Sequence, residues 1–397
     1  MRYTLTLFYL AVFALLGLGI VVLASASAVR AQGLYGDPHV FVNRQLVWLA
    51  VAAVTVALVC RFDYHWWKST PALSVGAYLL VTMGLLLVFA PGIGSKVKGS
   101  YRWLNLGPLR VQPSEFAKIL TVIAMGVWMD RIGWRVSKFV KGALLPGIGL
   151  GILAGLLVLE PDFGSTLVVC MVGGTLMFIA GTRFIYLGAF FSVGVVAVGA
   201  VLLSNANRMW RLAAWLPKYL QEFISRWIPP SHAEVGTDAA RYQLEQAILA
   251  FKNGGPFGVG FNQSIQKYNY LPEAHTDFIF AIGGEEFGFL FSLGVILAYL
   301  IILFCGVSIT LRAPDKLGRL LAFGMTFLLV FQAAFNIGVV TGCLPTKGLA
   351  LPFMSYGGTN LITALIAVGT LLNIGRHVDV RDERLHTQVV RNAAKEL

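Results

Sequence analysis

Ten apolar runs, each close to the length that a helix needs to cross a bilayer, dominate this sequence. A helix spans the hydrocarbon core with about 20 mostly apolar residues, because it rises about 1.5 Å per residue. Of the 397 residues 57% are hydrophobic and only 13% are charged, which excludes an ordinary soluble domain. We therefore predict an all-α polytopic membrane protein with about ten transmembrane helices. The runs cover residues 5–29, 44–60, 72–90, 114–130, 142–159, 163–181, 184–204, 277–311, 319–341 and 356–374.

The first run follows Met1-Arg2 and ends in small residues, as a secretory signal peptide does. It is longer than the apolar core of a signal peptide, which has roughly 7 to 15 residues, so we interpret it as the first membrane helix. We expect residues 1–374 to form a single transmembrane domain with a long loop at about 205–276. Residues 375–397 are charged and short, and we expect a tail with little fold of its own.

The distribution of basic residues predicts the orientation. If the N-terminus is cytoplasmic, the inner loops and the tail hold sixteen Lys and Arg residues, against seven in the short outer loops. Cytoplasmic loops favour Lys and Arg, so we predict that both termini are cytoplasmic and that the loop at 205–276 lies outside. The net charge of +12 is dispersed between apolar runs and forms no basic stripe. This pattern argues against nucleic acid and favours contact with anionic membrane lipids.

The cysteines and histidines predict neither a disulfide framework nor a metal site. The four cysteines show no C-x-x-C spacing, and three of them lie in apolar runs, where cysteine behaves as a small hydrophobic residue. The six histidines are scattered, without an H-E-x-x-H or comparable ligand set.

Four of the seven outer cations crowd into the loop at 91–115, namely Lys96, Lys98, Arg102 and Arg110. One interpretation is that they only contact the phosphates of outer-leaflet lipids. We favour a second interpretation, a pocket for phosphate or pyrophosphate, because Arg is a forked donor and Lys a point charge that suits such anions.

Charged residues also lie at the starts of two predicted helices. Glu115 and Lys118 follow Pro113 and share one helical face, so they form either a self-neutralising pair or, as we favour, a pair that also shapes an outer cavity. The turn at 159–166 contains Glu160 and Asp162. Asp162 fits a helix cap and a site residue equally well.

The stretch at 271–290, LPEAHTDFIFAIGGEEFGFL, passes from an acidic entrance into an apolar run. A charged carboxylate at the bilayer centre costs roughly 2.5 to 3.5 kcal/mol, so such residues usually serve a polar site. We predict that Asp277 lies where a membrane helix meets a water-filled pocket and accepts a proton. Asp277 also fits an N-cap, which would lower its pKa and weaken it as a base. For Glu285 and Glu286 we favour buried pairing within the bundle.

Three further segments have recognisable patterns. Residues 209–227 mix Trp, Leu and Phe with Arg and Lys, which suits an amphipathic helix in the membrane interface. Residues 240–251 predict a second helix, followed by a glycine-rich segment that permits a turn or a close backbone approach to a ligand. The prolines and glycines at 341–360 predict irregular backbone, buried in protein or lining an aqueous cavity.

Taken together, these segments resemble the SEDS family (shape, elongation, division and sporulation) of polytopic peptidoglycan glycosyltransferases. The resemblance covers nearly the whole chain, and the form LPEAHTDFIFAIGGEEFG with Pro345-Thr346-Lys347-Gly348 is most similar to the cell-division branch, with the elongation branch as the close relative. Thr359-Asn360 departs from the serines usual after SYGG, which puts contacts of that loop in doubt. The motifs of this chain that carry the resemblance to the SEDS family are RWLNLGPLRVQPSEFAK, EPDFGST, YQLEQAILA, LPEAHTDFIFA and PTKGLALPFMSYGG.

The resemblance implies polymerisation of lipid II at the outer face of the cytoplasmic membrane, with release of undecaprenyl pyrophosphate. Asp277 takes the place of the family's essential aspartate, and a hydroxyl nucleophile needs such a base within hydrogen-bond reach. A divalent cation beside the pyrophosphate is compatible with the sequence, although no cofactor is firmly implied. We predict that the substrate-binding residues are Lys96, Lys98, Arg102, Trp103, Gln112, Glu115, Lys118, Asp162, His275, Lys347 and Ser355.

The implied partners are lipid II, the growing glycan strand, a class B penicillin-binding protein and other membrane proteins of the division machinery, and the implied location is the division septum. Two rival functions stay open on physical grounds. A flippase for the same lipid would also have many spans, midplane charges and broken helices. A scaffold for division proteins would need no active site at all.

Overall fold

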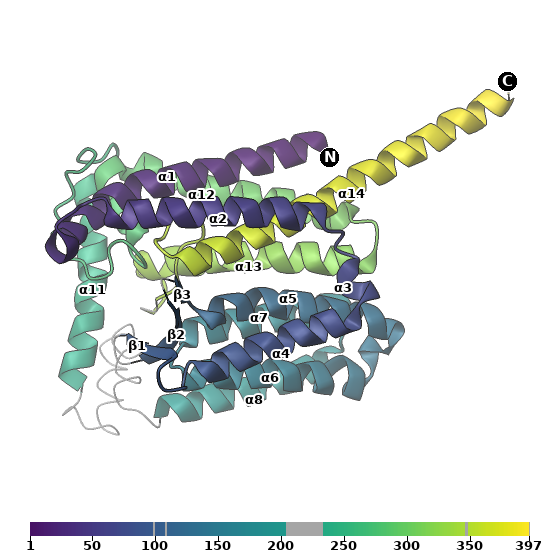
Figure 1. Cartoon of the computed structure of the whole chain (residues 1–397), viewed down its shortest axis with the longest axis horizontal. Helices are drawn as coiled ribbons and strands as arrows, with labels where there is room; N and C mark the ends of the chain where they lie inside the picture. The colour runs from purple at the N-terminus through teal and green to yellow at the C-terminus, as the bar shows by residue number, and fades with distance from the viewer. Residues whose placement is uncertain (98–99, 108, 204–232, 346–347, 397) are drawn as a thin grey trace.

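The computed structural model describes residues 1–97, 100–107, 109–203, 233–345 and 348–396 as a helical bundle with one small sheet (Figure 1). The α-helices are α1 (Arg2–Tyr35), α2 (Val40–Arg61), α3 (Trp66–Ser69), α4 (Pro71–Leu87), α5 (Pro113–Ile132), α6 (Leu145–Leu159), α7 (Phe163–Ala180), α8 (Phe184–Leu203), α11 (Ala233–Gly254), α12 (Ile279–Arg312), α13 (Lys316–Val340) and α14 (Gly358–Glu396). A 3-10 turn, η1 (Gly133–Ser137), and a π-helical turn, η2 (Phe139–Leu144), lead into α6.

Each of the ten predicted spans coincides with a helix, and most boundaries differ by a few residues, whereas α14 continues 22 residues beyond the predicted end at 374. Within the described ranges, seven helical segments are long and apolar enough to cross a membrane. α4 and α8 supply shorter apolar stretches, 72–87 and 184–194, and α5 carries charged residues near both of its ends. The prediction of a polytopic helical membrane protein is therefore confirmed, with seven segments meeting the criterion for a full span.

The basic loop at 91–115 is not irregular, because most of it folds into a three-stranded antiparallel sheet. Its strands are β1 (Gly94–Val97), β2 (Ser100–Leu106) and β3 (Leu109–Val111), in the order β1-β2-β3. Aromatic and β-branched residues alternate with polar ones here, a pattern that favours strands, and Gly107 has the positive φ that a tight turn requires. An all-α prediction missed this sheet because the segment was judged by its charge.

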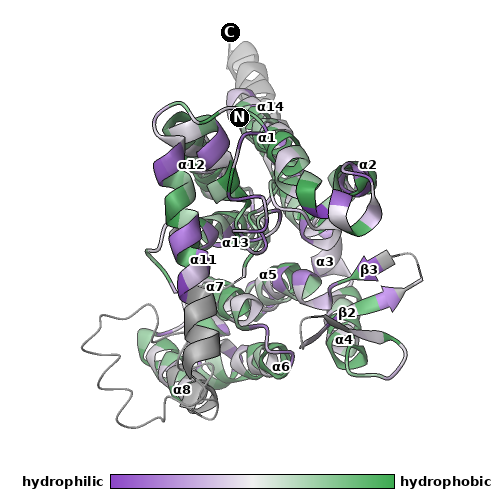
Figure 2. Cartoon of the chain, turned by 90° about the vertical axis from the view of Figure 1, so that its left-hand side faces the viewer, coloured by the Kyte–Doolittle hydropathy of each residue, from purple (hydrophilic) through white to green (hydrophobic). Residues whose placement is uncertain are grey.

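The sheet and α11 lie at the same end of the helices (Figure 1). Figure 2 looks at this end, where α11 carries many hydrophilic residues and α6 and α7 are mainly hydrophobic. α11 confirms the helix predicted at 240–251 and extends it toward the N-terminus. The amphipathic helix predicted at 209–227 lies outside the described residues.

Two apolar clusters form the interior. The larger joins α1, α5, α7, α12, α13 and α14, and the smaller joins α4, α5, α6 and α7 around Leu85 and Leu157. α5 and α7 belong to both clusters, so residues at their N-terminal ends are held between the two halves of the bundle. The backbone of α14 remains helical through Glu396 and projects away from the bundle, although the charged sequence after residue 374 predicted a tail with little fold (Figure 1).

The helix after Asp277 is broken at Gly288, whose φ of 76° and ψ of −165° are not helical. Residues 254–260 pack against this break: the amide of Val259 donates to the Glu285 carbonyl at 3.0 Å, and the amide of Phe289 donates to the Gly255 carbonyl at 2.8 Å. A Cβ atom on Gly288 would lie 2.6 Å from the Pro256 carbonyl oxygen, so only glycine fits. The glycine-rich segment, for which a turn or a close approach to a ligand was predicted, thus packs its backbone against α12.

Candidate active site

Asp277 lies in the turn that precedes α12, and its side chain is half buried. Its carbonyl oxygen accepts a hydrogen bond from Nδ2 of Asn336 on α13 at 2.8 Å. The N-cap of α12 is Phe278, whose side chain makes no capping hydrogen bond. The interpretation of Asp277 as the N-cap is therefore wrong by one position, because the N-cap is the residue that follows it. Asp277 still lies near the N-terminus of α12, the positive end of the helix dipole.

The segment at 348–357 packs against Asp277 from the opposite side. A Cβ atom on Gly348 would lie 3.2 Å from Cγ of Asp277 and closer still to Oδ2. Oγ of Ser355 donates to the Thr276 carbonyl at 2.6 Å and accepts from the Leu351 amide at 2.7 Å. The turn that carries Asp277 is therefore tied to this segment by the Ser355 hydroxyl and by the close approach of Gly348.

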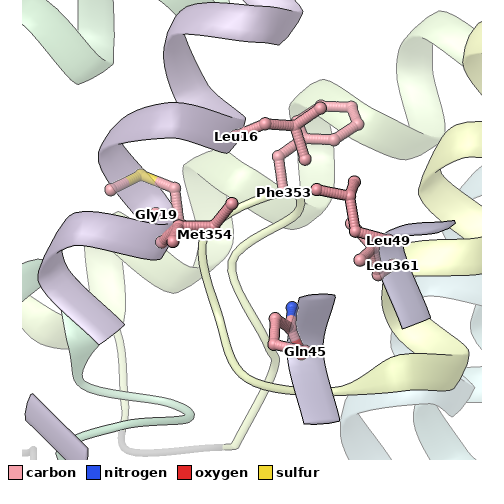
Figure 3. Close-up of a pocket in the computed structure, with 8 residues that line it drawn as sticks. Leu16, Gly19, Gln45, Leu49, Phe353, Met354 and Leu361 are labelled. Atoms are coloured by element: carbon pink, nitrogen blue, oxygen red, sulfur yellow. The ribbon is translucent and has the colours of Figure 1, made fainter. Parts of the chain in front are cut away.

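The segment at 348–357 is itself wedged into the bundle, as the irregular backbone predicted for 341–360 requires. Figure 3 shows Phe353 and Met354 beside Leu16 and Gly19 of α1 and Leu49 of α2. A Cβ atom on Gly19 would lie 2.7 Å from Cα of Met354, so the two backbones meet directly. Tyr299 of α12 donates its hydroxyl proton to the Pro352 carbonyl.

Glu115 and Lys118 form the ion pair that their spacing predicts. Nζ of Lys118 lies 2.8 Å from Oε1 of Glu115, and both side chains are buried. The ammonium also donates to Oε1 of Gln332 at 3.0 Å, and Thr363 donates to Glu115 at 3.4 Å. Because each charge has an opposite charge and a further hydrogen bond, the pair is tolerated away from water.

Helix α13 connects this pair to the Asp277 turn. Gln332, which accepts from Lys118, donates to the Ala350 carbonyl at 2.8 Å, and Asn336, one turn later, donates to Asp277 and to the Leu349 carbonyl. A small cavity lies next to the ion pair, and Asp277 is not among the residues that line it. The lining residues are Glu115, Lys118, Ile119, Leu328, Leu329, Gln332, Pro352, Asn360, Thr363 and Ala364.

Asp162 caps α7 and also holds the start of α5. Its Oδ1 accepts from the Ser165 amide at 3.2 Å, which confirms the cap. Its Oδ2 accepts from Ser114 at 3.1 Å and from Nε2 of Gln112 at 3.4 Å. The backbone amide of Gln112 donates to Oγ1 of Thr359 at 3.3 Å. Thr359, which departs from the SEDS pattern, therefore contributes a contact here.

Arg102 on β2 reaches the turn between α6 and α7. Its Nε donates to the Glu160 carbonyl at 3.1 Å, so this guanidinium is bonded to backbone. The Glu160 side chain is fully buried, and neither of its oxygens has a hydrogen-bond partner among the described atoms. Burial, followed by the nearby charge of Asp162, raises the pKa of Glu160 to about 8, against the opposing effect of Arg102. Burial therefore favours the neutral acid form of Glu160.

Some of the other predicted binding residues lie within the part of the chain that the structure describes, and some lie outside it. His275 is buried, with its ring centroid 5.1 Å from that of Phe41 and 6.0 Å from that of Tyr356. Trp103 is half buried on β2, in register with Ser95 of β1. Lys98 and Lys347 lie outside the described residues, and Lys96 is described only as part of β1.

The two glutamates of α12 are held by buried partners, as we favoured. Glu285 accepts hydrogen bonds from the hydroxyl of Ser264 and, at 3.1 Å, from Nδ2 of Asn253. Glu286 accepts from the hydroxyl of Ser25 and lies 3.4 Å from Nζ of Lys267, whose side chain is 1% exposed. Sequence reasoning missed Lys267, because a lysine in a long loop gives no sign that it will be buried.

The structure therefore brings most of the placed residues into three connected groups. One surrounds Asp277 with His275 and Ser355, the second is the Glu115–Lys118 pair, and the third joins Gln112 and Asp162 with Arg102 reaching the same turn. Residues of α5, α13 and the 348–357 segment link the groups by the hydrogen bonds above.

Comparisons with known proteins give a consistent result. The sequence signature of the cell cycle protein family FtsW/RodA/SpoVE matches residues 6–380. A protein of Trichlorobacter lovleyi named probable peptidoglycan glycosyltransferase FtsW is 39% identical over 367 residues, which are 92% of this chain and 91% of that one. A protein of Coxiella burnetii with the same name is 39% identical over 365 residues, 91% of this chain and 93% of that one.

Solved structures agree in fold. A chain from a study titled structural coordination of polymerization and crosslinking by a peptidoglycan synthase complex is 26% identical and has a TM-score of 0.71. The match covers 94% of this chain and 97% of that one. The rod shape determining protein RodA of Thermus thermophilus is 25% identical, with a TM-score of 0.65 over 93% of this chain and 95% of that one.

Proposed function

This chain belongs to the FtsW/RodA/SpoVE family of cell cycle proteins, and on that premise we propose that it is a peptidoglycan glycosyltransferase that polymerises lipid II during cell division. The relatives at 39% identity carry the name of that activity and cover nearly the whole chain. Within the molecule, one observation carries the proposal: the carboxylate of Asp277 is half buried in the turn before α12, and the backbone of Gly348 lies directly against it.

Asp277 is the general base of this proposal. The acceptor sugar attacks the anomeric carbon of the donor through its 4-hydroxyl, and Asp277 removes the hydroxyl proton as the new bond forms. The bond from the anomeric carbon to the diphosphate oxygen breaks, and undecaprenyl pyrophosphate leaves with the electron pair. An anionic leaving group that cations stabilise needs no acid, so one carboxylate suffices, unlike the two carboxylic residues of glycoside hydrolases.

Lys118 and Arg102 are the described cations that we assign to the lipid diphosphate. The Lys118 ammonium has three donors, two of which serve Glu115 and Gln332. Nε of Arg102 donates a hydrogen bond to the Glu160 carbonyl, and this bond fixes the position of the guanidinium group. Pre-positioned donors of this kind stabilise developing negative charge without reorganising during the reaction.

We assign the protein to the cytoplasmic membrane of a bacterium, with both termini inside and the Asp277 site facing outward. The apolar helices and the family membership support a multi-pass membrane protein. The excess of basic residues in the assigned inner loops supports the orientation. The division septum follows from the similarity to the FtsW relatives, and a class B penicillin-binding protein as partner is consistent with the peptidoglycan synthase complex.

A lipid flippase is the second candidate, and the break in α12 at Gly288 is the feature that favours it, because transporters use broken helices at membrane depth. The partners at this break argue against a transport site. Glu285 and Glu286 are bonded to Ser264, Ser25 and Lys267, and residues 254–260 close the broken backbone.

Detergent micelles separate the two functions, because a micelle has no second compartment into which lipid can be moved. Purified protein is incubated in micelles with fluorescent lipid II, and the products are separated by gel electrophoresis. We expect glycan strands and free undecaprenyl pyrophosphate. Lipid translocation in sealed vesicles without polymer in micelles would identify a flippase and contradict the proposed activity.

A further inference from the structure

Folding brings two of the scattered histidines together with an aspartate at the end of the bundle opposite the strands, where α3 lies (Figure 1). Asp63 and His65 come from the turn between α2 and α3, and His377 comes from α14. One possible ligand atom of each lies within 4.8 Å of those of the other two. No sequence motif marks this group, because more than 300 residues separate His377 from the others.

The hydrogen bonds of the two rings fix which nitrogens carry protons. Nδ1 of His377 lies 2.9 Å from the Asn373 carbonyl, and Nδ1 of His65 lies 2.6 Å from Oδ1 of Asp63. A carbonyl or an ionised carboxylate can only accept, so both Nδ1 atoms donate. In the neutral imidazole the other nitrogen, Nε2, is then a lone-pair acceptor in both residues.

Each Nε2 atom faces a carboxylate. Nε2 of His377 lies 3.6 Å from Oδ2 of Asp63, and Nε2 of His65 lies 3.7 Å from Oδ1 of Asp315. Two acceptors that face one another repel unless a cation or a proton lies between them. The arrangement therefore calls for positive charge at both contacts, and it presents imidazole nitrogens and carboxylate oxygens as the groups that would bind it.

The surroundings hold these side chains in position. Nδ2 of Asn373 donates to the Phe62 carbonyl at 2.7 Å, which joins α14 to the end of α2, and Tyr64 donates its hydroxyl proton to Asp315. The bond from His377 to the Asn373 carbonyl orients the ring in the way that metal-binding histidines are usually oriented by an outer partner.

We propose that Asp63, His65 and His377 form a binding site for a divalent transition-metal ion, with Asp315 as a neighbouring carboxylate. Imidazole and carboxylate ligands together suit Zn²⁺ and its neighbours in the series, whereas Mg²⁺ and Ca²⁺ prefer all-oxygen sites. The ion binds between Nε2 of His377 and Oδ2 of Asp63, and water completes its coordination. By joining the α2–α3 turn to α14, the ion stabilises this end of the bundle.

The required adjustment is small. Zinc lies about 2.0 to 2.2 Å from N and O ligands, so two ligands of one tetrahedral ion stand roughly 3.3 Å apart. The 3.6 Å between His377 and Asp63 is already close to that separation. His65 must give up its short bond to Asp63 and turn, which its 42% exposed side chain allows.

The test uses untagged, full-length protein in detergent, stripped of metal with a chelator. Co²⁺ is the probe, because Co²⁺ with nitrogen ligands absorbs visible light, and Zn²⁺ is then added as competitor. We expect one equivalent of Co²⁺ to produce saturable absorption bands that Zn²⁺ abolishes. His65→Ala and His377→Ala should each weaken binding at least tenfold, about the loss caused by removing even an outer partner. His39→Ala, which changes an exposed histidine outside the group, should bind as the unchanged protein does.

Two results would overturn the proposal. One is the lack of saturable Co²⁺ binding by the unchanged protein, and the other is Co²⁺ binding by His65→Ala and His377→Ala as tight as that of the unchanged protein. If these variants do not fold, X-ray absorption of the zinc-loaded, unchanged protein decides the question. A shell with two imidazole ligands supports the site, and a shell without imidazole contradicts it.

Discussion

Gly348 and Asp277 are in direct contact: a Cβ atom on Gly348 would lie 3.2 Å from Cγ of the Asp277 carboxyl group and closer still to Oδ2. The contact joins the segment before the last helix to the turn before α12, although about seventy residues separate the two in sequence. The space available at residue 348 therefore limits the positions that the carboxylate of Asp277, the proposed base, can occupy.

Gly348→Ala should consequently impair activity much more than stability. The flexible carboxylate can move aside at little cost to folding, but a displacement of about 1 Å at a reacting group can lower a rate about a hundredfold. We expect about that loss in the rate of lipid II polymerisation, with a melting temperature near that of the unchanged protein. Gly17→Ala is the matched control, since a Cβ atom there has no neighbour within 4 Å. Equal rates for both variants would show that Asp277 is not constrained by this contact.

The buried pair Glu115–Lys118 predicts a non-additive effect on stability. Lys118→Met leaves the Glu115 carboxylate without its cation, and such a change usually lowers the free energy of unfolding by about 3 to 5 kcal/mol. Adding Glu115→Gln should restore much of that loss, while polymerisation stays slow because Lys118 is assigned to the substrate. Denaturant unfolding and the micelle assay measure the two effects.

Arg30→Met is the control for the Lys118 and Glu115 variants, because the ion pair between Arg30 and Glu273 is partly exposed. Pairs of that kind contribute about 0 to 1 kcal/mol. A single Lys118→Met variant as stable as Arg30→Met would contradict the account of the buried pair.

Glu160 predicts a pH dependence of stability. Its pKa in the folded protein is about 8, above the ordinary value of 4.5, because the side chain is buried. Between these pH values the unfolded chain has released a proton that the folded protein keeps, so stability falls as pH rises, by about 1.4 kcal/mol per pH unit at most. Below pH 4.5 both states hold the proton, and the effect disappears.

Glu160→Gln should remove this slope, because the amide has the shape of the neutral acid and does not ionise. Denaturant unfolding at several pH values between 5 and 8 provides the comparison, with Glu245→Gln on the exposed surface of α11 as control. If the Gln variant and the unchanged protein keep the same slope, Glu160 is ionised in the folded state and the argument from burial fails.

Lys267 should be essential for holding the segment at 260–278 against α12. Lys267→Met leaves the fully buried Glu286 without its cation, which we expect to cost about 3 to 5 kcal/mol. The loss should appear as faster limited proteolysis within 260–278 and as a lower melting temperature. Lys252→Met, at an exposed lysine, should change stability by less than about 0.5 kcal/mol. Similar proteolysis of both variants would contradict this role.

The positions of the helices could be predicted from the sequence because bilayer thickness fixes the length of an apolar run. The Glu115–Lys118 pair and the Asp162 cap were also predictable, since both depend on residues three positions apart. Backbone conformations that depend on segments far away in the sequence could not be predicted in this way. The break at Gly288 depends on residues 254–260, which a local pattern does not contain.

Partners far apart in sequence were missed for the same reason. The position of Asp277 against Gly348, the burial of Lys267 and the meeting of His65 with His377 all depend on which helices become neighbours. The charges of the 91–115 loop suggested anion binding but concealed its strand pattern, and Arg102 proved to contact the backbone at Glu160. Sequence therefore indicated which residue types matter, and folding determined which of them meet.

The most direct test of the account is Asp277→Asn, which removes the proton acceptor while keeping the size of the side chain. The micelle assay with fluorescent lipid II measures the rate, and Asp37→Asn, at an exposed aspartate, is the control. We predict a rate about 10² to 10⁴ lower for Asp277→Asn, with an unchanged melting temperature and unchanged lipid II binding. Polymerisation at the normal rate by the Asn variant would contradict the assignment of Asp277 as the general base.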